Sequence, residues 1–124
     1  MRLYPTLEAE FIQNIPKGWV DPENGRVFKN GGYRMVGDLQ QADGVKFLCP
    51  KCYAEIGSRP GVHGVICWFV GRVADDVSPR PGRWTPDGTG LADLSFVPSP
   101  GRSQSVALLS GCMWHGFVVN GDAT

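Results

Sequence analysis

The chain has no long hydrophobic run and no excess charge of either sign. Its apolar stretches are shorter than the roughly 18 residues of a membrane-spanning helix, so we expect no membrane association. Twelve basic and twelve acidic residues cancel. A protein that binds nucleic acid through its phosphates usually carries a basic excess, and this balance therefore argues against nucleic acid as a partner.

Common catalytic motifs and a secretory signal are also missing. The chain has no glycine-rich phosphate loop, nucleophile elbow or dinucleotide-binding fingerprint, and it has only two histidines. Residues 1–6 lack the apolar run of a secretory signal. We therefore expect a protein that is not an enzyme and is synthesised in the cytoplasm, where clustered cysteines more often bind metal than form disulfides. An enzyme that uses the loop at residues 75–90 is the disfavoured alternative.

What the chain does contain predicts a small, mainly β protein with many loops. Hydrophobic residues make up 42% of its 124 residues, and 17 glycines and 10 prolines indicate frequent turns. Length and composition predict a single domain over residues 1–124. The segments with strand-like composition are residues 7–11, 45–48, 64–70, 94–97, 105–109 and 116–119. Turn signals such as residues 98–101 and 110–111 separate them, which favours an antiparallel sandwich or barrel.

Some segments allow two interpretations. Residues 7–11 alternate apolar and polar side chains, but a short helical turn fits as well. The first forty residues are rich in turn formers and are either an extended arm or an added strand. Residues 75–90 form a long loop dense in proline and glycine, which we expect Trp84 to hold in place.

Two short pairs of ligand residues predict a structural zinc site. Cys49 and Cys52 form one pair, and Cys112 and His115 form the other. A gap of two residues lets both side chains of a pair converge on one tetrahedral ion, while the backbone amides between them point at the thiolates. Four protein ligands leave no position for water, so we expect a zinc knuckle that is structural and not catalytic.

Other uses of these cysteines stay open. The first pair could be a redox pair, although its flanks do not resemble the strand-then-helix setting of thioredoxin-like sites. The four cysteines of the chain could also form two disulfides. Cys67 lies two residues from both Val65 and Phe69, so a strand places all three on the same face. This position suits a buried, inert thiol, but Cys67 could also replace His115 as the fourth ligand. We expect His63, just before a predicted strand, to lie at the surface or beside the ligands.

Tryptophan and arginine residues in turn-rich stretches are the candidates for contact with a partner. Trp19 and Trp84 lie in such stretches, and tryptophan is enriched at protein interfaces. Arg80 and Arg83 lie in the same long loop as Trp84. These four residues are our predicted partner contacts.

From Gly44 onward the chain resembles a family of small uncharacterised proteins of bacteriophages and prophages. The resemblance rests on blocks at residues 47–52, 65–69, 81–84, 88–91, 93–98, 111–112 and 114–118. It covers roughly two thirds of the chain. More distant members place the late cysteine and histidine next to each other, whereas two residues separate them here.

The resemblance implies a phage product of no established activity. We expect a non-enzymatic protein that acts through contacts with phage structural proteins or with copies of itself. Our first hypothesis is a virion-associated decoration, capsid or neck component. The alternative is a phage-encoded modulator that binds a host protein or nucleic acid.

Overall fold

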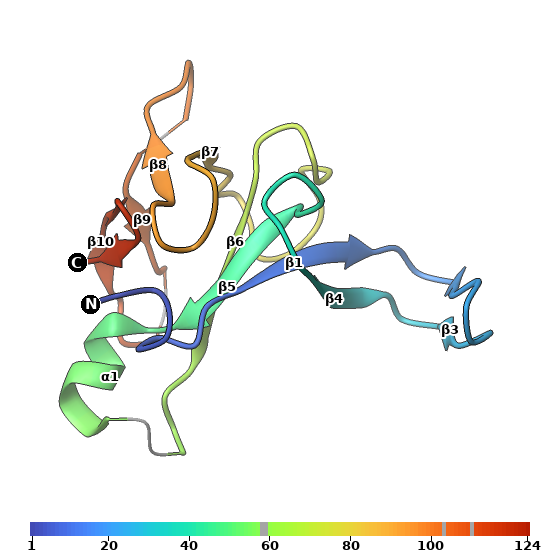
Figure 1. Cartoon of the computed structure of the whole chain (residues 1–124), viewed down its shortest axis with the longest axis horizontal. Helices are drawn as coiled ribbons and strands as arrows, with labels where there is room; N and C mark the ends of the chain where they lie inside the picture. Colours follow the sequence, from blue (N-terminus) through green and yellow to red (C-terminus); the bar gives the residue numbers. More distant parts are fainter. Residues whose placement is uncertain (58–59, 103, 110) are drawn as a thin grey trace.

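In the computed structural model, residues 1–57, 60–102, 104–109 and 111–124 are described, and they form mainly antiparallel β-strands with one short helix (Figure 1). The elements in chain order are β1 (Glu10–Ile15), β2 (Trp19–Val20), β3 (Val27–Phe28), β4 (Gly32–Val36), β5 (Gly44–Leu48), α1 (Pro50–Ile56), β6 (Gly64–Trp68), β7 (Thr85–Asp87), β8 (Ser95–Val97), β9 (Val106–Ala107), β10 (His115–Gly116), β11 (Val118–Val119) and β12 (Asp122–Ala123). The predicted mainly β class is confirmed, and the sheets of these residues do not close into a barrel. Ser110 of the predicted turn at 110–111 lies outside the described residues.

The largest sheet has four antiparallel strands in the order β4-β1-β5-β6. Its two best-predicted strands, β5 and β6, are rich in β-branched and aromatic residues and pair directly, with Phe47 opposite Val65. The other sheets are two-stranded pairs: β2 with β3, β7 with β8, β9 with β10, and β11 with β12.

The structure corrects the sequence interpretation at three elements. The strand predicted at residues 7–11 begins at Glu10 and runs to Ile15, because Leu7 packs in the core while Glu8 takes a left-handed φ of 52°. Strand β4 and helix α1 were not predicted. The expected long loop at residues 75–90 contains β7 in its second half.

Side chains on the two faces of the large sheet enter different hydrophobic clusters. Phe11, Val45 and Cys67 belong to the main core, which also takes in residues of β8, β9 and β11. Ile12 and Trp68 lie in a second cluster, under Val73 of the following loop. Both faces of the sheet centre are therefore covered, as expected for strands that are apolar on both sides.

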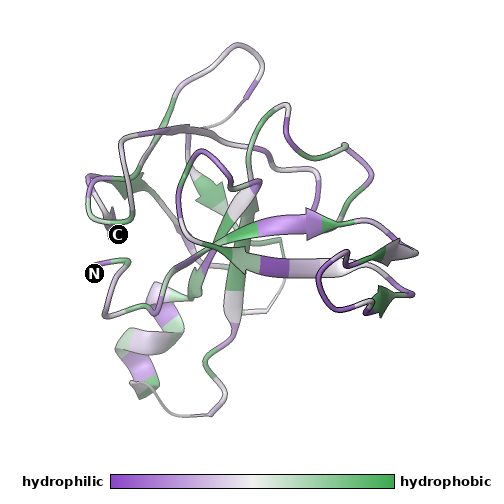
Figure 2. Ribbon diagram, turned by 45° about the vertical axis from the view of Figure 1, so that its right-hand side comes forward, coloured by the Kyte–Doolittle hydropathy of each residue, from purple (hydrophilic) through white to green (hydrophobic). Residues whose placement is uncertain are grey.

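The first forty residues contribute two strands to the large sheet and one projecting hairpin. Strands β1 and β4 pair along five positions. Between them, β2 and β3 form a hairpin that extends beyond the sheet (Figure 1) and carries hydrophobic residues at its outer end (Figure 2). Val20 and Val27 of this hairpin are 51% and 58% exposed. No helix in the described ranges is long and apolar enough to span a membrane.

Candidate metal centre

Four side chains converge beside helix α1, at the end of the four-stranded sheet. They are Cys49, Cys52, His63 and Cys112, and their ligand atoms all lie within 4.8 Å of one another. Cys49 is buried, Cys52 and Cys112 are half-buried, and His63 is exposed. The group combines soft thiolate and imidazole donors, the donor set that zinc prefers.

Cys49 and Cys52 are placed by the transition from strand to helix. Strand β5 ends at Leu48, Cys49 is the N-cap residue of α1, and Pro50 takes the first helical position, where its missing N–H costs nothing. Cys52 follows in the first helical turn. Burial raises the pKa of the Cys49 thiol, and the nearby backbone N–H groups of Cys52 and Lys51 partly offset this rise.

His63 is placed by the register of the β5–β6 pair. The Cys49 N–H donates to the His63 carbonyl over 3.0 Å, one step beyond the last named pair of the two strands. The histidine therefore lies directly across the ladder from the first cysteine. Its Nε2 is 3.2 Å from the Cys112 Sγ.

Cys112 approaches from the turn between β9 and β10. Gly111 and Met113 on either side have left-handed φ values of 69° and 55°, which brings the Cys112 side chain towards α1. The backbone N–H of Trp114 contributes to the lowered pKa of the Cys112 thiol, after the larger effect of His63. The Lys51 Nζ donates to the Cys112 carbonyl over 2.8 Å. The turn is thus held against the helix by polar contacts as well as by the cluster.

The distances are close to those of a tetrahedral zinc site. Zinc–ligand bonds of about 2.0–2.3 Å place neighbouring ligand atoms about 3.5–3.8 Å apart. The Cys49 and Cys112 Sγ atoms are 3.5 Å apart, and the His63–Cys112 contact is slightly shorter. One ion at the centre of the four atoms therefore needs only small side-chain adjustments.

The pKa values of the three clustered cysteines are shifted in opposite directions by their surroundings. The hydrogen bond with His63 is the main cause that lowers the pKa of Cys112 to about 6. Desolvation by burial is the main cause that raises the pKa of Cys49 and brings that of Cys52 to about 12. Without a metal, the thiols of Cys49 and Cys52 are therefore protonated. A bound cation would displace these protons.

The histidine in the cluster differs from the one predicted from the sequence. His115 lies on β10, is exposed, and pairs across the hairpin with Ala107, and its ring lies against Phe117 at 6.2 Å between centroids. His115 is not among the residues whose ligand atoms converge. The predicted cysteines Cys49, Cys52 and Cys112 do come together, and His63 supplies the histidine.

Cys67 is not part of the cluster. It is fully buried on β6 with its side chain in the main core, and burial raises its pKa. A thiol in this environment is held in its protonated form. The interpretation of Cys67 as a buried thiol is confirmed.

The predicted contact residues fall in different environments. Arg83 is only 2% exposed, so the structure corrects its assignment as a contact residue. Trp84 is half-buried, stacks on Phe96 at 5.8 Å, and donates from Nε1 to the Ser105 carbonyl over 3.0 Å, which holds the long loop as predicted. Arg80 is exposed, and Trp19 is half-buried in the projecting hairpin against Phe28.

We compared the chain with protein-family models, curated proteins and solved structures. None of them matches. The resemblance to the phage family described above therefore stays a prediction.

Proposed function

We propose that the protein binds one Zn²⁺ ion through Cys49, Cys52, His63 and Cys112 and is a non-enzymatic protein that acts through contacts with other proteins. The single observation that carries the proposal is the convergence of these four ligand atoms. Such an ion supplies structural cross-linking and no chemistry, because four protein ligands leave no open position for water or substrate.

The position of the cluster supports a structural role. Cys49 and Cys112 are 63 positions apart in the chain. A bond through zinc closes this long segment and joins α1 and the start of β6 to the β9–β10 turn. Because the unfolded chain has no preformed site, the free energy of binding stabilises the folded state. A loop-rich chain of this size gains particularly from such a link.

Exposed apolar residues support action through protein contacts. Val20 and Val27 on the β2–β3 hairpin are more than half exposed, and Met35 on the neighbouring edge strand is 65% exposed. A projecting hairpin with apolar side chains suits docking onto a partner surface. Trp19 beside them, under the Arg34 guanidinium at 5.0 Å, adds an aromatic residue to this face.

Native mass spectrometry of the purified chain tests the zinc proposal. We expect a mass increase of one zinc ion per chain in the unmodified protein. Cys112→Ser should lose the ion, whereas the control Cys67→Ser, which also removes one thiol, should retain it. A metal-free unmodified chain, or full zinc in Cys112→Ser, would contradict the proposal.

Within this class we propose a virion-associated role, supported by the sequence resemblance and by the exposed hairpin. Peptide mass spectrometry on purified particles of a phage that encodes the chain tests it. Recovery in many copies per particle is the expected result. Absence from clean particles would contradict the virion role and leave a modulator of a host protein as the alternative.

A further inference from the structure

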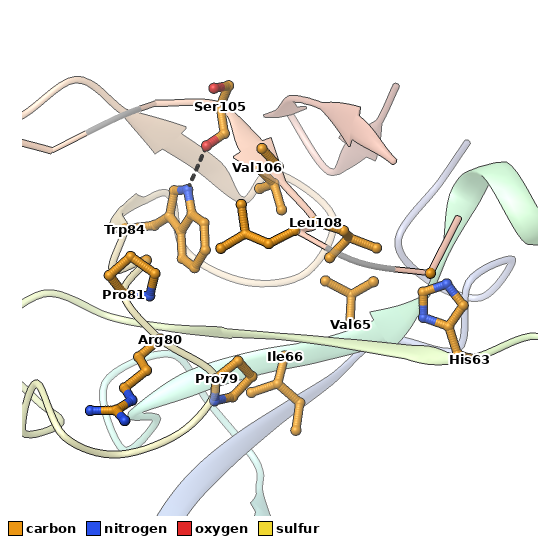
Figure 3. Close-up of a pocket in the computed structure, with 14 residues that line it drawn as sticks. His63, Val65, Ile66, Pro79, Arg80, Pro81, Trp84, Ser105, Val106 and Leu108 are labelled. Atoms are coloured by element: carbon orange, nitrogen blue, oxygen red, sulfur yellow. Dashed lines mark hydrogen bonds between the residues drawn. The ribbon is translucent and has the colours of Figure 1, made fainter. Parts of the chain in front are cut away.

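An apolar groove lies between the outer edge of β6 and the segment that contains β9. Its volume is about 530 Å³, and its walls include Val65, Trp84, Val106 and Leu108. Figure 3 shows His63 near one end of the groove and Arg80 with the neighbouring prolines near the other. The histidine of the metal cluster therefore forms one boundary of the groove.

The β6 edge along this groove has unpaired backbone groups. The hydrogen bonds Cys49 N–H to His63 and Phe69 N–H to Asp43 fix the register, so the odd-numbered residues of β6 bond to β5. The N–H and C=O of Ile66 point to the opposite side. In the described ranges, no backbone group outside the β5–β6 ladder bonds to them.

The chain itself pairs with this edge of β6 at the next outward-pointing residue, Trp68. The Trp84 N–H donates to the Trp68 carbonyl over 3.0 Å, and the Val70 N–H donates to the Trp84 carbonyl over 2.9 Å. Continuation of this parallel pairing would bring the Gly82 N–H to the Ile66 carbonyl and the Arg80 carbonyl to the Ile66 N–H, and neither bond is formed. The segment instead turns away, and the position beside Ile66 is open to another strand.

The opposite wall offers a second backbone edge. The Leu108 N–H donates to the Trp114 carbonyl, which makes Leu108 and Trp114 a hydrogen-bonded pair of the β9–β10 hairpin. Ala107, one residue earlier, lies at a position where its N–H and C=O point away from β10. Ala107 also lines the groove. An occupant between the walls therefore meets backbone donors and acceptors on both sides.

The charge of the lining selects the chemistry of the occupant. Among the residues that the structure describes, Arg80 and His63 are the ionisable ones that line the groove, and none of the lining residues is acidic. The exposed Arg80 has no ion-pair or hydrogen-bond partner in the part of the chain that the structure describes. A carboxylate at this end of the groove would find an unpaired guanidinium.

We propose that the groove binds an extended peptide segment of a partner protein, which adds as a strand to β6 and places a carboxylate beside Arg80. Apolar side chains at alternate positions of the segment fill the space between Trp84 and Val106. The β6 edge spans about 13 Å from Gly64 to Trp68, the length of four to five extended residues. Backbone bonds to Ile66 give affinity, and the pocket and Arg80 give specificity. This inference rests on the proposed role in protein contacts.

Selection from a synthetic library of random peptides of about eight residues, on the zinc-loaded full chain, tests the proposal. We expect enriched peptides with alternating apolar residues and an acidic residue or terminal carboxylate near one end. Arg80→Glu should weaken their binding about tenfold or more, whereas Arg26→Glu on the distant hairpin should leave it within about twofold. Absence of enriched peptides, or equal effects of the two variants, would overturn the proposal.

Hydrogen exchange on the same complex provides the second measurement. Bound peptide should slow exchange of the Ile66 amide about tenfold or more, because this N–H becomes a ladder donor. Unchanged exchange at Ile66, or binding of decanoate as a small apolar carboxylate without any enriched peptide, would overturn strand addition. Zinc content is measured on the same sample. A failure of the zinc proposal can therefore be distinguished from a failure of the peptide-binding proposal.

Discussion

Arg83 shows how one residue organises the long loop from inside. Its two terminal nitrogens donate to the carbonyls of Ala74, Val77, Pro79 and Gly82 over 2.6–2.9 Å. Burial lowers its pKa, yet these carbonyls and the nearby Asp75 offset the cost of the charge. In a loop with few hydrogen bonds of its own, the guanidinium replaces regular secondary structure.

We predict that Arg83→Ala lowers the free energy of unfolding by about 2–4 kcal/mol, because it leaves buried carbonyls without donors. Arg80→Ala in the same loop removes an exposed side chain that bonds to none of the described residues, and it should change stability by less than about 0.5 kcal/mol. Urea unfolding of both variants measures the difference. Equal stability of the two variants would show that Arg83 does not organise the loop.

A second residue-scale prediction concerns Asp93. Its carboxylate accepts hydrogen bonds from the backbone N–H groups of Thr89 and Gly90 and from the Thr89 hydroxyl, each over 2.9 Å. These bonds lower its pKa in the folded state. The stabilisation is therefore present above the pKa of the unfolded chain and is lost as the pH falls through the lower folded value.

Asp93→Asn should therefore have a lower Tm than the unmodified chain at pH 7, and the gap should narrow as the pH falls below about 4. Thermal unfolding monitored by circular dichroism across this range measures it. Asp87→Asn, in β7, is the control, because no described residue donates a hydrogen bond to its carboxylate. A gap that is independent of pH would contradict the argument.

At the scale of elements, the β5–β6 pair positions most of the site. It sets Cys49 opposite His63, leads into α1 with Cys52, and leaves the outer edge of β6 open to the groove. Close packing of the pair depends on Gly44. A Cβ at Gly44 would lie 2.6 Å from the Cys67 carbonyl oxygen and 2.8 Å from the Trp68 ring, and neither can move freely.

We therefore predict that Gly44→Ala costs about 1–3 kcal/mol of stability. Gly64→Ala lies in the same ladder, but the nearest atom to its Cβ would be the flexible end of the Lys46 side chain at 3.2 Å. The second substitution should change stability by less than about 1 kcal/mol. Urea unfolding of both variants measures the difference. Similar losses of unfolding free energy would show that the close contacts at Gly44 do not set the cost of the substitution.

The elements that sequence reasoning missed have physical reasons. Strand β4 has almost entirely exposed side chains, so it shows no alternation, and it exists because β1 offers a partner strand. Helix α1 is only seven residues long, too short for a visible helical period. Strands β5 and β6 were found because each carries a dense β-branched and aromatic signal.

At the scale of the whole molecule, the site joins parts of the chain that are distant in sequence. The late turn with Cys112 meets the β5–α1 corner, and the first residues lie beside the last strand, where the Met1 amino group donates to the Ala123 carbonyl over 2.8 Å (Figure 1). The three cysteines were predictable from local spacing. The histidine was not, because spacing favoured His115, and only the pairing of β5 with β6 brings His63 to the cluster.

The pairing of two predicted strands is the only feature of the sequence analysis that points towards His63. Both strands were predicted, and direct antiparallel pairing of consecutive strands is common. A register that places Phe47 opposite Val65 also places Cys49 opposite His63. The register of a pair depends on side-chain packing across the whole sheet, however, and local sequence does not specify it.

Zinc binding by His63→Ala and His115→Ala tests the central claim most directly. Both histidines are exposed, so neither substitution opens a cavity in the core. Competition with a chromogenic chelator should show that His63→Ala weakens zinc affinity by at least about tenfold, while His115→Ala binds as tightly as the unmodified chain. Loss of zinc affinity in His115→Ala with unchanged affinity in His63→Ala would contradict the site described above.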